Sequence, residues 1–282
     1  MLKIEHTEVV GWEPAIRGMR NPLESWARSD SEYKCPYREP GAPICSNCTE
    51  NICLGANDHD LMTRLRDAGM DHRKFMRFLD VYVDITAPLY WWKEFKTYRA
   101  GRAFGDDEPD ICLIPDEYLE FDIEMNSCST MHKIHSKEFT LEDFSCEHLS
   151  ECDGEYVDIL SVDPYSMPAM QSSDFLKTVI EGLNYFRRLY LETKDKKYWW
   201  QMIQLLPSSY NQKRTLKLTY EVLANMYKSR RNHKLDEWHT FCDWIESLPY
   251  FELITGSIGK KVVINGDGSP MLWEENAEPK GE

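Results

Sequence analysis

The chain has 282 residues, of which 42% are hydrophobic and 12% aromatic, so it has enough apolar side chains to form a folded core. Its formal net charge of −15 argues against a protein held to duplex nucleic acid by phosphate contacts, which would need a basic surface. No stretch approaches the roughly 20 apolar residues of a membrane span. The first ten residues lack the apolar core of a signal peptide, so we expect a cytoplasmic protein with no membrane partner.

The first half of the chain predicts two helices and a strand. Apolar residues at helical spacing predict a helix over 58–68, ended by Gly69. Residues 78–85 are rich in β-branched and aromatic side chains that partly alternate with polar ones, which favours a strand. Proline is tolerated in a first helical turn, so Pro88 is compatible with a helix over 89–95. The segment 101–126 is acidic and irregular and predicts an exposed insertion.

The C-terminal half predicts four helices from apolar residues at helical spacing, over about 175–190, 198–206, 214–230 and 235–248. Ser173 or Asp174 is a candidate cap for the first of them. Residues 266–282 are rich in Gly, Pro and charge and predict a frayed tail. With no internal repeat and no clear linker, we expect one domain over 1–265.

A cysteine-rich loop is predicted over 35–57. It holds Cys35, Cys45, Cys48 and Cys53, and the C-x-x-C pair within it is typical of a zinc site with four thiolate ligands. An iron–sulfur cluster, a redox pair and free thiols are the alternatives. The chain has nine cysteines, an odd number, and no secretion signal, so reduced thiols are expected rather than a disulfide framework.

Three separate blocks resemble the flavin-dependent thymidylate synthases. Residues 14–20 read Pro-Ala-Ile-Arg-Gly-Met-Arg and are similar to an early Ala-Val-Arg-Ala-Ala-Arg segment of that family. In the second block, His72 falls on the first His of the family's Gly-His-x-Ser/Thr-Pro-Phe-Glu-His segment, and the spacing from there to Ala87-Pro88 fits the family without a gap. The resemblance implies that His72 lies near a flavin. Glu94 falls on a family Gln beside the nucleotide site.

The family signature Arg-His-Arg corresponds to Thr97-Tyr98-Arg99, so only its last Arg is kept. The resemblance implies that these three residues contact the cofactor. Beyond the acidic insertion the similarity resumes near Ser129, which together with Lys133 is implied to bind the substrate. At the position of the family's nucleotide-binding Arg this chain has Met131.

The third block covers residues 204–238. Its Leu-Pro pair, amphipathic helix and final Glu-Trp pair resemble the family's Leu-Pro, Asn-containing helix and Gln-Trp pair. Arg231 matches an Arg at the phosphate and pyrimidine end of the nucleotide, and is implied, with Glu94, to take part in catalysis. Asn225 and His233 are implied to contact the cofactor, although the offset of His233 from Trp238 differs from the family pattern.

Arginine suits such a site because its planar fork makes two hydrogen bonds to a phosphate or a pyrimidine carbonyl. In the matching blocks Arg17 and Arg214 are further cations for the substrate. A structural alternative is open for these residues: arginines at helix ends also complement carbonyl groups or pair with acids. His72 is equally compatible with a hydrogen-bonded, partly buried histidine.

The resemblance implies an α+β fold in which helices flank an antiparallel sheet, with a mostly helical C-terminal half and a homotetrameric assembly. It implies a transferase that methylates dUMP or modifies a related pyrimidine deoxynucleotide with FAD, reduced nicotinamide and methylenetetrahydrofolate. The cofactor then supplies the difficult chemistry, and the protein binds and orients.

Two other functions compete with this one. The loss of family arginines and of the central His of the signature favours a non-catalytic member that binds a nucleotide or another protein. The cysteine cluster favours an interaction protein stabilised by structural zinc.

Overall fold

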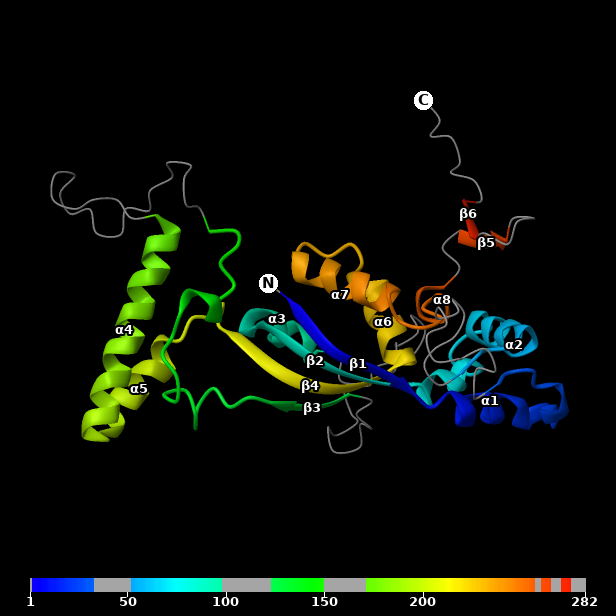
Figure 1. Ribbon diagram of the computed structural model, residues 1–282, viewed down its shortest axis with the longest axis horizontal. Helices are drawn as coiled ribbons and strands as arrows, with labels where there is room; N and C mark the ends of the chain where they lie inside the picture. Colours follow the sequence, from blue (N-terminus) through cyan, green and yellow to red (C-terminus); the bar gives the residue numbers. More distant parts are fainter. Residues whose placement is uncertain are drawn as a thin grey trace, which may run out of the picture. The chain divides into compact units, whose positions relative to one another are not determined.

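The computed structural model describes residues 2–32, 52–97, 123–149, 171–256, 260–264 and 270–274, and it mixes helices with antiparallel sheet (Figure 1). Its strands are β1 (Lys3–Val10), β2 (Asp80–Pro88), β3 (Glu124–Ser127), β4 (Asn211–Thr219), β5 (Lys260–Ile264) and β6 (Pro270–Glu274). Its α-helices are α1 (Trp12–Arg20), α2 (Ala56–Asp67), α3 (Leu89–Phe95), α4 (Ser172–Thr193), α5 (Lys196–Leu205), α6 (Tyr220–Arg230), α7 (Asp236–Glu246) and α8 (Glu252–Thr255). Among its short 3-10 helices, η3 (Arg73–Arg77) matters for the site.

The main sheet has the strand order β1-β2-β4-β3, and β5 and β6 form a separate antiparallel pair. Strand β3 pairs antiparallel with β4, which sets Ser127 opposite Arg214. The expected class, an α+β protein with an antiparallel sheet, is confirmed at this level. Within the described ranges no helix is both long enough and apolar enough to cross a membrane.

Two strands run directly into helices. Strand β2 ends at Pro88 and α3 begins at Leu89, while β4 ends at Thr219 and α6 begins at Tyr220. Pro88 is the N-cap of α3 with an extended backbone, and the Thr219 hydroxyl caps α6 by accepting the N–H of Val222 at 3.3 Å. The side chains on either side of these junctions are therefore fixed by both the strand and the helix.

The structure corrects several of the sequence-based expectations. Residues 124–126, expected in an irregular insertion, belong to β3, and residues 56–57, expected in the cysteine-rich loop, belong to α2. Residues 214–219 belong to β4 rather than to a helix, because buried and less buried residues alternate along that strand with the period of two that a strand requires. Neither Ser173 nor Asp174 caps α4, since its N-cap is Gln171 and no side chain bonds there. Part of the expected tail, 270–274, forms β6. The boundaries of the predicted domain stay a prediction.

The chain forms two compact units. The first comprises residues 1–7, 82–99 and 123–217, and the second comprises residues 8–81, 100–122 and 218–282. In the first unit α4 packs against α5, and the core includes side chains from both helices and from the segment before them: Ile134, Phe139, Phe144, Leu176, Ile180, Leu183 and Met202. The aromatic run of α3 is also core, with Trp91, Trp92 and Phe95 buried.

In the second unit α6 packs against α7, α8 and η3. The buried ring of Trp12 makes edge contacts with Tyr220 and Tyr250 at centroid distances of 5.7 and 5.2 Å. Gly11 precedes this Trp with a φ of 97°, and a Cβ there would lie 1.8 Å from the carbonyl oxygen of Phe78. Only glycine is compatible with both that conformation and that approach.

A buried ion pair joins α1 to α2 in the second unit. Arg20 donates from Nε and Nη2 to Oδ1 of Asp58 at 2.7 and 2.6 Å, and Asp58 is fully buried. The other carboxylate oxygen accepts from the hydroxyls of Ser29 and Ser31 at 2.7 and 2.6 Å. Burial alone raises the pKa of Asp58, but these hydrogen bonds and the charge of Arg20 outweigh it, so the pKa lies below its usual value.

Candidate functional site

A buried arginine is the central feature of the first unit. Arg214 lies on β4 with 6% of its surface exposed, and its guanidinium carbon is 4.3 Å from the centroid of the Trp92 ring. Nε and Nη2 donate to the amide oxygen of Gln212 at 3.1 and 2.8 Å, and Nη1 lies 3.1 Å from the sulfur of Met125. The guanidinium is thereby held in one orientation by neutral groups.

The local fold explains this arrangement. Gln212 and Arg214 are two residues apart on β4, so their side chains project from the same face of the strand. Trp92 is buried on α3, and its indole N–H donates to the carbonyl of Gln212 at 2.9 Å. The Gln212 amide in turn donates to the carbonyl of Cys128 at 2.6 Å. Strand, helix and the segment after β3 are therefore tied together around the arginine.

The electrostatics of Arg214 are unusual for a buried cation. In the part of the chain that the structure describes, no carboxylate makes an ion pair with it, and burial lowers its pKa. Burying a charge without a counter-charge costs free energy, and this cost falls when an anion binds beside it. An arginine stacked on an aromatic ring and bonded only to neutral groups can thus bind an anionic ligand.

Three other predicted site residues lie around the elements that hold Arg214. Ser129 follows β3 two residues after Ser127, the partner of Arg214 across the ladder, and its hydroxyl accepts the N–H of His132 at 2.9 Å. Glu94 is half-buried on α3, the helix that carries Trp92. Thr97 is exposed just beyond that helix and donates to the carbonyl of Glu94 at 2.7 Å.

Lys133 is exposed on the turn that follows Ser129. Tyr98 and Arg99 lie outside the described residues. Of the residues predicted to bind substrate, the first unit therefore has Arg214 on β4 and Ser129 just after β3, the strand that pairs with β4. Lys133 lies four residues beyond Ser129 along the chain.

The second unit holds a separate group of predicted residues around η3 and α6. His72 is exposed at the N-cap of η3, and the next residue, Arg73, donates from Nη2 to the amide oxygen of Asn225 at 3.1 Å. Two predicted cofactor contacts, His72 and Asn225, are thus joined through one arginine. The third, His233, accepts the N–H of Leu235 through Nδ1 at 3.1 Å.

The remaining predicted cations of the second unit already have acidic partners. Arg231 pairs with Asp243 at 2.6 Å and with Glu246 at 3.3 Å, and the hydrogen bond to Asp243 raises its pKa. Arg17 is exposed and pairs with Glu13 one helical turn away at 3.6 Å.

The sequence reasoning missed a buried acid beside the predicted cofactor residues. Glu221 is fully buried in the first turn of α6 and pairs with Arg77 and, at 3.4 Å, with Arg73. A glutamate on the otherwise apolar buried face of a helix, together with the basic run that follows His72, is the signal that points to such a pair. This pair anchors η3 to α6 and fixes the position of Arg73.

The predicted zinc site lies largely outside the described residues, which include none of Cys35, Cys45 and Cys48. Cys53 is half-buried with a free thiol, and its backbone forms an isolated bridge with Glu32. Across the described ranges no group of three or more His, Cys, Asp or Glu side chains is arranged to hold a metal ion. Zinc stays a prediction.

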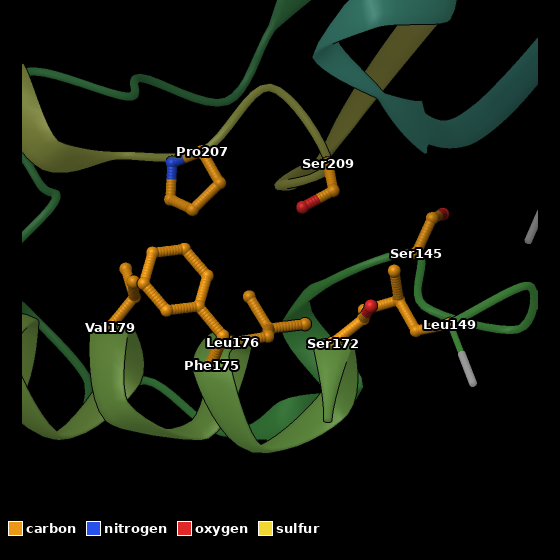
Figure 2. A pocket seen from close by; sticks show the side chains of 8 residues that line it. All are labelled: Ser145, Leu149, Ser172, Phe175, Leu176, Val179, Pro207 and Ser209. Carbon is orange, nitrogen blue, oxygen red and sulfur yellow. The ribbon is translucent and has the colours of Figure 1, made fainter. Parts of the chain in front are cut away.

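A mostly apolar cavity of about 470 Å³ lies within the first unit. It is lined by residues from the N-terminal turns of α4 and from two loops: Ser145, Leu149, Ser172, Phe175, Leu176, Val179, Pro207 and Ser209. Figure 2 shows the Phe175 ring across from Pro207, with the Ser209 hydroxyl directed into the space between them. None of these residues was predicted as a site residue, and none of those that the structure describes around the cavity is charged.

Comparison with known proteins finds likeness at the level of fold. No family model matches the sequence, and no curated protein matches it. Two solved structures of the flavin-dependent thymidylate synthase ThyX from Helicobacter pylori, both with FAD and dUMP, match with a TM-score of 0.53 at 13% and 14% sequence identity. Each match covers 90% of this chain and 97% of the other. The chain therefore has a ThyX-like fold.

Proposed function

We propose that this protein binds FAD and a pyrimidine deoxynucleotide, and that it methylates dUMP or modifies a related base by flavin-dependent chemistry. The support is the ThyX-like fold over 90% of the chain, found in structures that hold FAD and dUMP, together with the colinear sequence blocks. Fold alone does not carry function, so the proposal depends on the site residues.

The observation that carries the proposal is Arg214. Its guanidinium is buried, oriented by Trp92 and Gln212, and has no carboxylate partner among the described residues. A nucleotide phosphate supplies the missing negative charge and accepts the charge-assisted hydrogen bonds that arginine forms best. Ser129, on the segment next to β4, would donate its hydroxyl to the same ligand, and Lys133 would add a second cation.

The flavin would be held by polar groups that can reach a ligand. His72 and Thr97 are exposed, while Asn225 is half-buried and already oriented by Arg73. Taken unit by unit, the Thr97 hydroxyl of the first and the His72 imidazole and Asn225 amide of the second are donors and acceptors of the kind that a flavin ring and its phosphates require. Tyr98, Arg99 and His233 complete the proposed set. When bound and reduced, the cofactor supplies hydride to the pyrimidine.

The protein's own contribution would be binding and orientation rather than covalent catalysis. Arg214 would fix the phosphate, and Glu94 would accept hydrogen bonds from the pyrimidine ring. Arg231 would bind the nucleotide only by exchanging one of its carboxylate partners, Asp243 or Glu246, for the ligand. Reduced nicotinamide, methylenetetrahydrofolate and a homotetramer belong to the same proposal.

Ligand binding and turnover can be tested separately. Purified protein mixed with FAD should show the shifted absorbance spectrum of a bound flavin, and calorimetry should detect dUMP. Arg214→Gln should weaken dUMP binding at least about tenfold while flavin binding is kept. Release of tritium from labelled dUMP, in the presence of reductant and folate, tests turnover. Absence of flavin binding would overturn the proposal.

A non-catalytic nucleotide-binding protein is the second candidate. It is favoured by Met131 at the position of the family's nucleotide-binding Arg and by the two carboxylates that neutralise Arg231. It predicts dUMP binding that depends on Arg214, without release of tritium under any condition that reduces the flavin.

A further inference from the structure

A surface rich in cations and aromatic side chains lies in the first unit, on segments of the chain that do not include Arg214. We define the basic–aromatic cluster as the turn 131–137, the end of α4 from Arg187, and the start of α5 through Trp200. In a chain with a net charge of −15, the segment 185–200 carries five cations against two acids, Glu192 and Asp195. The charge of this surface is therefore opposite to that of the whole molecule.

Hydrogen bonds and a ring contact join the three segments of the cluster. The Trp199 indole donates to the carbonyl of Met131 at 3.0 Å, and Arg187 donates through Nε to the carbonyl of His135 at 3.0 Å. The rings of His135 and Tyr190 meet at a centroid distance of 4.9 Å. Because α4 and α5 pack side by side, as Figure 1 shows, the turn is held against both helices.

Cations and aromatic rings alternate across this surface. The ammonium of Lys196 lies 5.8 Å from the centroid of the Trp200 ring, and that of Lys197 lies 4.6 Å from the Tyr198 ring. Trp200 is nevertheless 44% exposed, so part of a large aromatic side chain remains in contact with water. Exposed aromatic rings next to cations are typical of surfaces that bind single-stranded nucleic acid. The bases stack on the aromatic rings, and the cations contact the phosphates.

We propose that the basic–aromatic cluster binds single-stranded nucleic acid. The charge complements a phosphate backbone, and the exposed aromatic side chain gives a stacking platform that an acidic peptide would not use. Duplex nucleic acid hides the faces of its bases, so it would engage only the lysines and bind more weakly. This binding does not need flavin. Lys133 belongs both to the cluster and to the proposed nucleotide site, so the test uses Trp200 and Lys196, which belong to the cluster alone.

The test uses the full-length protein and a fluorescein-labelled oligo(dT) of roughly 20 nucleotides, longer than the sites of about 4–16 nucleotides that comparable grooves cover. Fluorescence anisotropy should show binding that weakens with salt. Trp200→Ala should raise the Kd at least about fivefold, because one stacked base is lost. Lys196→Glu should weaken binding and lower the slope of log K against log salt by about 0.7, the contribution of one phosphate contact to a single strand.

Matched controls come from the second unit. Trp26 is 49% exposed and Lys228 is exposed on α6, so Trp26→Ala and Lys228→Glu make the same chemical changes elsewhere, and neither should raise the Kd more than twofold. Absence of oligo(dT) binding overturns the proposal. Equal binding of polyglutamate also overturns it, as does an equal loss of oligo(dT) binding in the control variants. The proposal is overturned as well if the only effect of Trp200→Ala is a lower oligomer mass in light scattering.

Discussion

Two buried arginines, one in each unit, show how the same side chain serves two purposes. Arg20 in the second unit donates to a fully buried carboxylate, Asp58, whose other oxygen is bonded by two serines. Arg214 in the first unit stacks on Trp92 and bonds only neutral groups. The first arginine has its counter-charge within the fold and contributes to stability. The second has none among the described residues, so we assign it to ligand binding.

The largest expected effect is on the paired arginine. Asp58→Ala leaves Arg20 buried without a counter-charge, bonded only to the carbonyls of Ser25 and Arg28, which should cost about 3–5 kcal/mol of the free energy of unfolding. Urea denaturation measures this loss. The control is Asp60→Ala, which breaks an exposed pair with Arg64 on the same helix and should cost less than about 1 kcal/mol. A loss in Asp58→Ala no larger than in the control would contradict the structural role.

Replacing Arg214 by methionine should mainly weaken dUMP binding, whereas replacing Arg20 by methionine should mainly lower the free energy of unfolding. Arg214→Met removes a buried charge with no carboxylate partner, so the free energy of unfolding should change by no more than about 1.5 kcal/mol. The same variant should bind dUMP at least about tenfold more weakly, since a hydrogen bond to a charged group is worth about 1.5–3 kcal/mol. Arg20→Met should destabilise the protein. If Arg214→Met were the less stable variant, the assignment of the two roles would be reversed.

Acid should weaken the second unit through Asp58. Because the folded-state pKa of this carboxyl lies below its ordinary value of 3.8, its contribution is fully present above that value and is lost as the pH falls through the folded pKa. Unfolding free energies of the wild type should therefore fall below about pH 4. Asp58→Asn should be less stable at neutral pH and should lack this part of the acid dependence. Parallel curves for the two proteins would rule out the linkage.

The smallest effect is expected at Arg231. Its pairs with Asp243 and Glu246 are largely exposed, so Arg231→Ala should cost about 0–1 kcal/mol in urea denaturation. Calorimetry with dUMP then separates the alternatives for this residue. Weakened binding supports the role implied by the family resemblance. Unchanged binding leaves Arg231 as a surface ion pair.

The sequence predicts secondary structure correctly where the spacing of its apolar residues fits either a helix or a strand but not both. The helices near 58–68, 198–206 and 235–248 and the strand near 78–85 are present, since their apolar spacing fits one period only. It failed at 214–219, where Leu218 has helical spacing to Val222 but also alternates with Leu216 as in a strand, until β3 is known to pair there. Pairing between distant segments is invisible to local spacing.

The candidate site was only partly predictable for the same reason. Arg214 was chosen as a cation in a matching block, but its stacking on Trp92 depends on contact between residues 122 positions apart. Glu221 was missed because a glutamate inside a predicted helix looks like an ordinary exposed acid until Arg73 and Arg77 are found beside it. Composition also concealed the basic–aromatic cluster, because its positive charge is outweighed by the acidic residues in the rest of the chain.

The direct junctions of β2 with α3 and of β4 with α6 have a consequence for how this chain can diverge. Inserting one residue at Thr219 would turn α6 by about 100° about its axis, carrying Glu221 and Asn225 away from η3. An insertion at Pro88 would likewise move Trp92 off Arg214. The protein can therefore accept substitutions at these points far more readily than any change in length.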